Sequence, residues 1–195
     1  MIRIAVLGDI GSGKSFFAKQ LNIPLFNADN TVFDLYKSSR NLYAKLKKSF
    51  PKYISKFPID KDDLVKIINQ NPTNLKKIIK IVHPLVRKEM NKFLKKNKNK
   101  KAVVLDIPLF LENKLNLNTD ILVFVDPTKN KMMNKLKKRK NFNLKIYKLL
   151  KSAQLPLDLK KEKADFVVKN NFNSAKIKKD AKNLLDKVII WKRLY

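Results

Sequence analysis

Cysteine is absent from this 195-residue sequence, and histidine and glycine are scarce, at one and three residues. Without cysteine the chain can form neither a disulfide nor a thiolate metal site, and one histidine argues against a transition-metal centre. No run of about 18 apolar residues occurs, which excludes a membrane-spanning helix. The apolar stretch before Gly8 is too short for a signal peptide. We therefore expect a cytoplasmic protein with no membrane partner.

Negative charge is also scarce, because 16 acidic residues stand against 45 basic ones and give a net charge of +29. Only five of the basic residues are Arg, whose forked guanidinium is suited to base edges, and the rest are Lys. We interpret the excess as coding bias that acts on solvated surface positions, with no specific nucleic-acid partner. A positive field would still steer anionic substrates toward the protein.

Apolar residues make up 44% of the sequence, which favours a globular core over disorder. Short apolar runs that suit buried strands alternate with amphipathic helical patterns. The expected strands are Ile4–Leu7, Leu25–Phe26, Ala102–Asp106, Ile121–Val125 and Phe166–Val168. The expected helices are Lys14–Leu21, Lys129–Lys140, Ile146–Ala153 and Ala175–Trp191, and residues 31–100 are mostly helical. This alternation predicts an α/β fold with a parallel sheet between helical layers.

The segment Gly8–Ser15 (GDIGSGKS) matches the phosphate-loop pattern G-x-x-x-x-G-K-S and contains all three glycines of the chain. Glycines let such a loop curl so that its backbone N–H groups point at a phosphate, and the following helix adds its positive end. Lys14 would reach the β- and γ-phosphates of ATP, and the Ser15 hydroxyl would ligate Mg²⁺. The predicted ATP-binding residues are Gly11, Ser12, Gly13, Lys14, Ser15 and Phe16.

Two carboxylates lie at or just beyond the ends of expected strands, where side chains reach the crevice at the carboxyl ends of a parallel sheet. Asp29 is a candidate general base or orienting group for an acceptor hydroxyl, and the alternative is a helix N-cap, because helical sequence follows it. Asp106 is a candidate Mg²⁺ ligand, and the alternative is a cap on the turn before Pro108.

Further landmarks follow the phosphate loop in a fixed order along nearly the whole chain. They are Ala28-Asp29, HPLVR at 83–87, VVLDIPLFLEN at 103–113, Arg139, Gln154, EKADFVV at 162–168 and Asn170-Asn171. In this order they resemble the dephospho-CoA kinase family. The resemblance implies a kinase that transfers the γ-phosphate of ATP to the ribose 3′-hydroxyl of dephospho-CoA, the last step of coenzyme A biosynthesis.

The resemblance also implies roles for single residues. Asp29 and Lys14 would be catalytic together with Arg139, which lies on a basic helix where kinases of this architecture carry a lid. His83 and Arg87 would contact dephospho-CoA, with a structural histidine as the alternative for His83. The protein would act as a monomer or small homo-oligomer on two partners, ATP and dephospho-CoA.

Three positions depart from the family's pattern, and one of them is Lys140, where the family commonly has an acidic residue after the arginine. The family usually has glycine where Asp9 stands and aspartate where Asn27 stands. A carboxylate at position 9 would repel nucleotide phosphates unless the Asp9 side chain turned outward. The amide at position 27 shifts the catalytic burden to Asp29.

The predicted fold is a P-loop kinase-type, three-layer α/β/α domain with a five-stranded parallel sheet in the order 2-3-1-4-5. Its core would comprise residues 1–30, 86–137 and 161–195, with a helical substrate-binding insertion at 31–85 and a lid at 138–160. Two other functions stay open at this point. One is a P-loop kinase for a nucleotide or another small metabolite, and the other is a P-loop protein whose basic surface binds nucleic acid.

Overall fold

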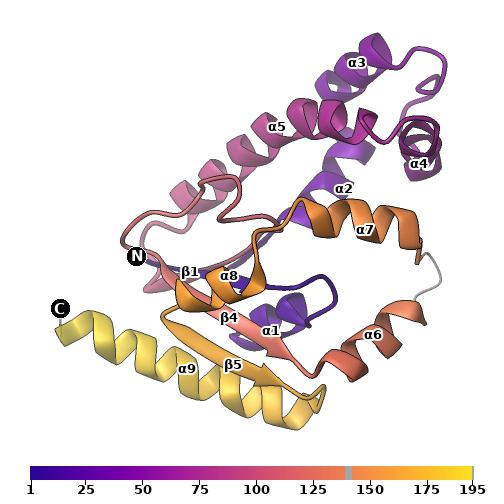
Figure 1. Ribbon diagram of the computed structural model, residues 1–195. Helices are drawn as coiled ribbons and strands as arrows, with labels where there is room; N and C mark the ends of the chain where they lie inside the picture. Colours follow the sequence, from indigo (N-terminus) through magenta and orange to yellow (C-terminus); the bar gives the residue numbers. More distant parts are fainter. Residues whose placement is uncertain (139–141, 195) are drawn as a thin grey trace. The chain divides into compact units, whose positions relative to one another are not determined.

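The computed structural model describes residues 1–138 and 142–194, with side chains described through Trp191. Strands and helices alternate through most of this part of the chain (Figure 1). The strands are β1 (Ile2–Gly8), β2 (Leu25–Asn27), β3 (Ala102–Asp106), β4 (Ile121–Pro127) and β5 (Phe166–Asn170). The helices are α1 (Lys14–Gln20), α2 (Ala28–Ser38), α3 (Arg40–Ser49), α4 (Lys61–Gln70), α5 (Asn74–Lys96), α6 (Lys129–Lys137), α7 (Leu144–Ser152), α8 (Leu157–Glu162) and α9 (Ser174–Leu194).

The five strands form one parallel sheet in the order β2-β3-β1-β4-β5, which confirms the predicted fold and strand order. In this register Gly8 pairs with Val125, and Asn27 pairs with Asp106. The phosphate loop therefore leaves the sheet at the same edge as the ends of β2 and β3. This is the carboxyl edge, where open α/β sheets bind their ligands.

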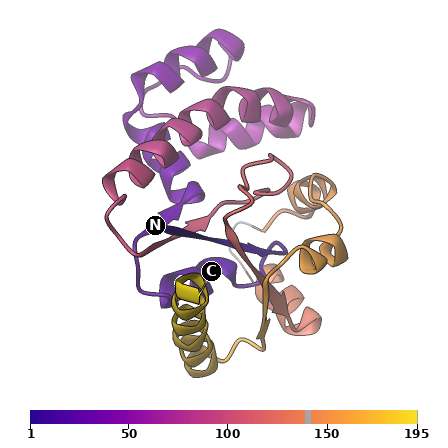
Figure 2. The same ribbon diagram turned by 90° about the vertical axis from the view of Figure 1, so that its left-hand side faces the viewer.

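A contiguous core fills the space between one face of the sheet and two helices. Alternate residues of β1 and β4, such as Ile4 and Val123, are fully buried against α1 and α9. Figure 2 shows these two helices side by side on that face. The apolar stripe expected on the last helix is confirmed, since Ile177, Ala181, Leu184 and Val188 are buried. Helix α8 contacts β1 from the other side, and β3 is buried along its whole length, as expected for a sheet that is covered on both faces.

The chain divides into two compact units, a sheet unit (Met1–Asn27 and Asn97–Tyr195) and a helical unit (Ala28–Lys96). The helical unit contains α2 to α5, and α5 packs against each of the other three helices. The sequence placed the end of the insertion near Pro84, but α5 continues through this proline to Lys96. Proline removes one helical hydrogen bond. The buried stripe Ile78, Val82, Val86 and Met90 nevertheless continues across it and keeps the helix in one piece.

Within the described residues, no helix is both long enough and apolar enough to cross a membrane. Of the expected lid at 138–160, the described part consists of α7, the connection that follows it and the start of α8. These elements belong to the sheet unit.

Candidate active site

The phosphate loop connects β1 to α1 and owes its shape to two glycines in the left-handed region, Gly11 at φ 79° and Gly13 at φ 87°. Close neighbours also exclude side chains at these positions. A Cβ atom on Gly11 would come within 2.6 Å of Leu136 Cγ on α6, and one on Gly13 would collide with Asn170 Nδ2. Both positions therefore require glycine for backbone and for steric reasons.

The end of the loop presents positive charge. Helix α1 begins at Lys14 with no acidic residue in its first turn, and Phe17 N donates to Gly13 O at 3.0 Å. Lys14 and Ser15 are half-buried, and Lys14 makes no ion pair with any residue that the structure describes. The Lys14 ammonium and the helix N-terminus suit a bound phosphate. Ser12 is fully buried, whereas 42% of Phe16 is exposed.

Asn170, the last residue of β5, supports the loop from behind. Its side chain is buried, with Nδ2 donating to Ser12 O at 2.8 Å and Oδ1 accepting from Phe172 N at 2.7 Å. These bonds join the phosphate loop to a segment 158 residues further along the chain. Asn170 is one of the landmarks in the sequence, but its role could not be predicted, because nothing in the local sequence indicates a contact over this separation.

Asp9 does not turn outward, and its charge is compensated in another way. It is only 4% exposed, because its carboxylate accepts from Ile10 N at 2.7 Å and lies 2.6 Å from Lys151 Nζ on α7. A buried carboxylate needs a positive partner or hydrogen-bond donors, and Asp9 has both. No sequence signal pointed to Lys151, which is one Lys among many on the chain.

Asp106 ends β3 beside β2 and is 1% exposed. Its Oδ2 accepts from Asn27 Nδ2 at 2.6 Å, while Oδ1 is buried without a hydrogen-bond partner among the described residues. Such an oxygen fits a hard cation, and Mg²⁺ in kinases needs only one or two protein oxygens beside the phosphates. The described part of the chain contains no cluster of three or more acidic or histidine side chains that could hold a metal alone.

Asp29 is exposed and is the second residue of α2, in the helical unit. The helix begins at Ala28, so Asp29 lies inside the first turn and not at the position before the helix that an N-cap occupies. An acidic side chain there is favourable toward the helix dipole. Its separation from the end of β2 is two residues of chain.

His83 and Arg87 lie one turn apart on α5. His83 is half-buried and Arg87 is exposed. Burial, and then the positive charge of Arg87, lowers the pKa of His83 below its ordinary value of 6.5. At neutral pH His83 is therefore an uncharged hydrogen-bonding group beside a guanidinium. Arg139, the third predicted catalytic residue, lies outside the described residues.

Comparison with known proteins gives the family. The family model described as dephospho-CoA kinase matches residues 2–176. The chain belongs to the dephospho-CoA kinase family. Its relatives named dephospho-CoA kinase include one from Wolbachia sp. subsp. Brugia malayi, which is 31% identical over 188 residues, or 94% of this chain and 96% of the relative. Another, from Bartonella quintana, is 32% identical over 170 residues, or 85% of this chain and 87% of the relative.

Solved structures agree with a fold of the dephospho-CoA kinase family. A Thermus thermophilus protein has a TM-score of 0.76 at 24% identity, with 95% of this chain and 97% of that chain covered. A dephospho-CoA kinase from Campylobacter jejuni has a TM-score of 0.66 at 22% identity, with 95% and 96% covered. At these identities the likeness bears on the fold alone. The family confirms the resemblance that the sequence landmarks carried.

Proposed function

We propose that this chain transfers the γ-phosphate of ATP to the ribose 3′-hydroxyl of dephospho-CoA, with the phosphate loop as its nucleotide site. The chain is a kinase of the dephospho-CoA kinase family, whose reaction ends coenzyme A biosynthesis. The single observation that supports this nucleotide site is the loop Gly8–Ser15 at the carboxyl edge of the sheet. Two of its glycines have left-handed backbone conformations, and Lys14, which follows them, is half-buried. We expect the enzyme to act in the cytoplasm.

On the nucleotide side, the backbone N–H groups of the loop and the start of α1 would bind the phosphates. Lys14 would hold the β- and γ-phosphates and balance the charge that develops as the γ-phosphoryl group leaves ADP. Two observations support this role: Lys14 forms no ion pair with the described residues, and the first turn of α1 has no acidic residue. Arg139 would add a second positive group from the expected lid.

The chain's own residues fit Mg²⁺. The Ser15 hydroxyl follows Lys14 in the loop, and Asp106 has a buried carboxylate oxygen without a hydrogen-bond partner in the described chain. These two oxygens would hold the ion directly or through water, and Mg²⁺ supplies charge neutralisation of the polyphosphate when it is bound. Asn27 fixes the orientation of Asp106 through its 2.6 Å hydrogen bond.

On the acceptor side, Asp29 would orient the ribose 3′-hydroxyl and accept its proton as the oxygen attacks the γ-phosphorus. His83 and Arg87 of the helical unit would bind dephospho-CoA, with Arg87 suited to an anionic part of that substrate. Neutral His83 can donate or accept a hydrogen bond without adding charge.

A coupled assay of ADP release tests the proposal. We expect ADP release to depend on added dephospho-CoA and to be far slower with nucleoside monophosphates. Lys14→Ala should lower the rate by about 10³-fold or more, because it removes a charge directed at the transferred phosphate. Lys19→Ala, an exposed position on the same helix, is the matched control and should leave the rate unchanged. Equal turnover of nucleoside monophosphates, or an active and folded Lys14→Ala variant, would contradict the proposal.

A further inference from the structure

The phosphate loop of this chain contains an acidic residue that is almost completely buried. The Asp9 side chain is 5% exposed, with Oδ1 accepting from the neighbouring Ile10 N and Oδ2 2.6 Å from Lys151 Nζ. Asp9 O also accepts from Ser12 N at 3.1 Å, so the same residue shapes the turn that leads into the phosphate-binding part of the loop. A change in the position of Asp9 would therefore also change the conformation of the loop.

The partner, Lys151, comes from the last turn of α7. The structure describes every residue of α7, and none of them is fully buried, although Ile146, Leu149 and Leu150 are half-buried. Within the described chain, Lys151–Asp9 is the one ion pair that α7 makes. Tyr147 lies one turn before Lys151, and burial and then the charge of Asp9 raise its pKa. The contact between α7 and the loop is made by Lys151.

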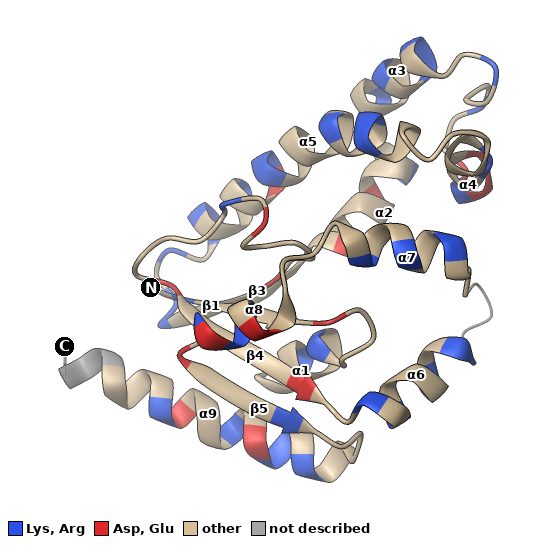
Figure 3. Cartoon of the chain, viewed as in Figure 1, with Lys and Arg blue, Asp and Glu red and all other residues tan. Residues whose placement is uncertain are grey.

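The chain that follows α7 is also fixed to the sheet unit. Glu112, in the connection after β3, accepts from Leu155 N at 2.9 Å and pairs with buried Lys160 at 2.5 Å. Figure 3 shows the basic residues along α6 and α7 in blue. Among all these cations, Lys151 is the one that reaches the carboxylate in the loop.

The pair differs in kind from surface ion pairs such as Lys66–Asp63 and Lys92–Glu89, whose members are one turn apart and solvated. Asp9 is shielded from water, so its charge is screened mainly by Lys151. Without the Lys151 ammonium, the loop that binds a polyphosphate would contain an uncompensated, buried negative charge. Repulsion would then act on the nucleotide through the loop.

We propose that Lys151 is a positioning residue of the phosphate loop, which neutralises Asp9 and holds its carboxylate away from the nucleotide phosphates. The inference rests on the proposed nucleotide site and adds to it. It makes ATP affinity depend on a residue of α7 that acts through Asp9. It also predicts a definite pattern of coupling between the two positions, because Lys151 is needed only while position 9 carries a charge.

The experiment compares Lys151→Met, Asp9→Asn and the double variant. Asparagine keeps an oxygen that can accept from Ile10 N but removes the charge. Calorimetry with MgATP alone gives the affinity, and steady-state kinetics give KM for each substrate. We expect Lys151→Met to weaken MgATP binding about tenfold. This is less than the usual effect of leaving a buried charge unpaired, because about a third of the Lys151 side chain is exposed to solvent. Asp9→Asn should change the MgATP affinity less than threefold, which is roughly the effect of losing a solvent-exposed ion pair.

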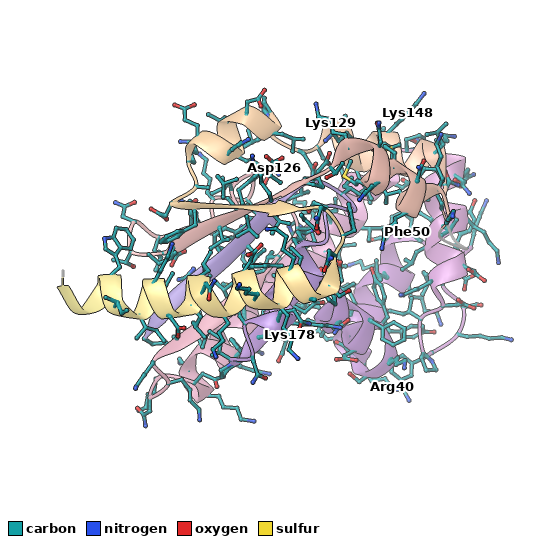
Figure 4. All side chains as sticks on the ribbon, turned by 90° about the horizontal axis from the view of Figure 1, so that it is seen from below. Arg40, Phe50, Asp126, Lys129, Lys148 and Lys178 are labelled. Atoms are coloured by element: carbon teal, nitrogen blue, oxygen red, sulfur yellow. The ribbon has the colours of Figure 1, made fainter. Side chains whose placement is uncertain are left out.

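The double variant decides the question. We expect it to bind MgATP as Asp9→Asn does, and KM for dephospho-CoA to stay unchanged throughout. Lys148→Met is the matched control, since Lys148 is exposed on the same helix (labelled in Figure 4), and it should leave affinity unchanged. If Lys151→Met fails to fold, recovery of folding and binding in the double variant supports the same coupling.

Three outcomes would overturn the inference. Unchanged MgATP affinity in Lys151→Met would mean that the pair does not act on the nucleotide. A double variant as weak as Lys151→Met would mean that Lys151 contacts the nucleotide itself. A double variant that stays unfolded would mean that Lys151 has a packing role. None of these readouts uses dephospho-CoA turnover, so they stay separate from a failure of the proposed kinase activity.

Discussion

At the end of β2, an amide and a buried carboxylate share one hydrogen bond. Asn27 donates to Asp106 at 2.6 Å, where a second carboxylate would repel the first. Asn27 has no acidic group with which to take up a proton from an acceptor hydroxyl. Asp106 is held in place and has one oxygen suited to a metal. Asp29, two residues further along the chain, is the next carboxylate in the sequence and the first candidate for the general base.

Replacing Asp29 with asparagine tests this assignment. Asparagine keeps the size and part of the hydrogen bonding of the side chain but cannot accept the proton of the 3′-hydroxyl. We expect kcat to fall by roughly 10²–10⁴, the usual contribution of one general base. Calorimetry should show that ATP and dephospho-CoA still bind, since Asp29 acts on the transition state.

Asp34→Asn, at an exposed position of the same helix, is the control and should retain full kcat. Full kcat in Asp29→Asn would transfer the role to another carboxylate, with Asp106 the next to test. Loss of folding in Asp29→Asn, with Asp34→Asn intact, would instead support a structural role at the start of α2.

At the scale of elements, much of the fold could be predicted from local pattern. Short apolar runs in the sequence predicted the strands of the sheet, and the apolar stripe from Ile177 to Val188 predicted α9. Predictions failed where local and distant effects compete. Pro84 predicted a boundary that the packing of α5 overrides. For Asp9 the sequence suggested only an outward side chain as a way to avoid repulsion, because nothing in the sequence places Lys151 beside it. Contacts between residues far apart in sequence need the topology.

The contact between β5 and the phosphate loop gives a prediction at the scale of elements. Gly13→Ala should impair ATP binding strongly, because its Cβ would collide with Asn170 Nδ2 and because φ 87° is strained for alanine. In an Asn170→Ala background the collision is absent and only the strain remains. We expect the added loss from Gly13→Ala to shrink there, with a coupling of roughly 1–3 kcal/mol in ATP binding by calorimetry.

Asn170→Ala alone should weaken ATP binding, because Ser12 O loses its buried donor. Asn171→Ala is its control, because Asn171 is exposed and its side chain accepts from Asn173 N. Additive effects of Gly13→Ala and Asn170→Ala would show that the two residues do not restrict each other. Asn170 would then contribute to stability without shaping the loop.

At the scale of the whole molecule, the dominant property is a net charge of +29. Membership of the dephospho-CoA kinase family makes this charge relevant to substrate binding, because the substrates ATP and dephospho-CoA are both anions. Many of the Lys side chains are exposed and pair with no acid, because acidic residues number only 16. Such a surface attracts anions at a distance, whereas each single charge contributes little to stability.

Ionic strength should therefore change the encounter with substrate more than the chemistry. The Debye length falls from about 30 Å at 0.01 M salt to about 10 Å at 0.1 M, so the field of distant lysines is progressively screened. Over this range we expect kcat/KM for ATP to fall roughly 3–10-fold while kcat changes little. Steady-state kinetics in potassium chloride and in potassium acetate should give the same curve, because screening depends on ionic strength and not on which anion is present. A neutral osmolyte at matched osmolality should leave kcat/KM unchanged. A flat kcat/KM, or a loss seen with one anion alone, would mean that the surface charge does not steer the substrates and that salt acts at a specific site.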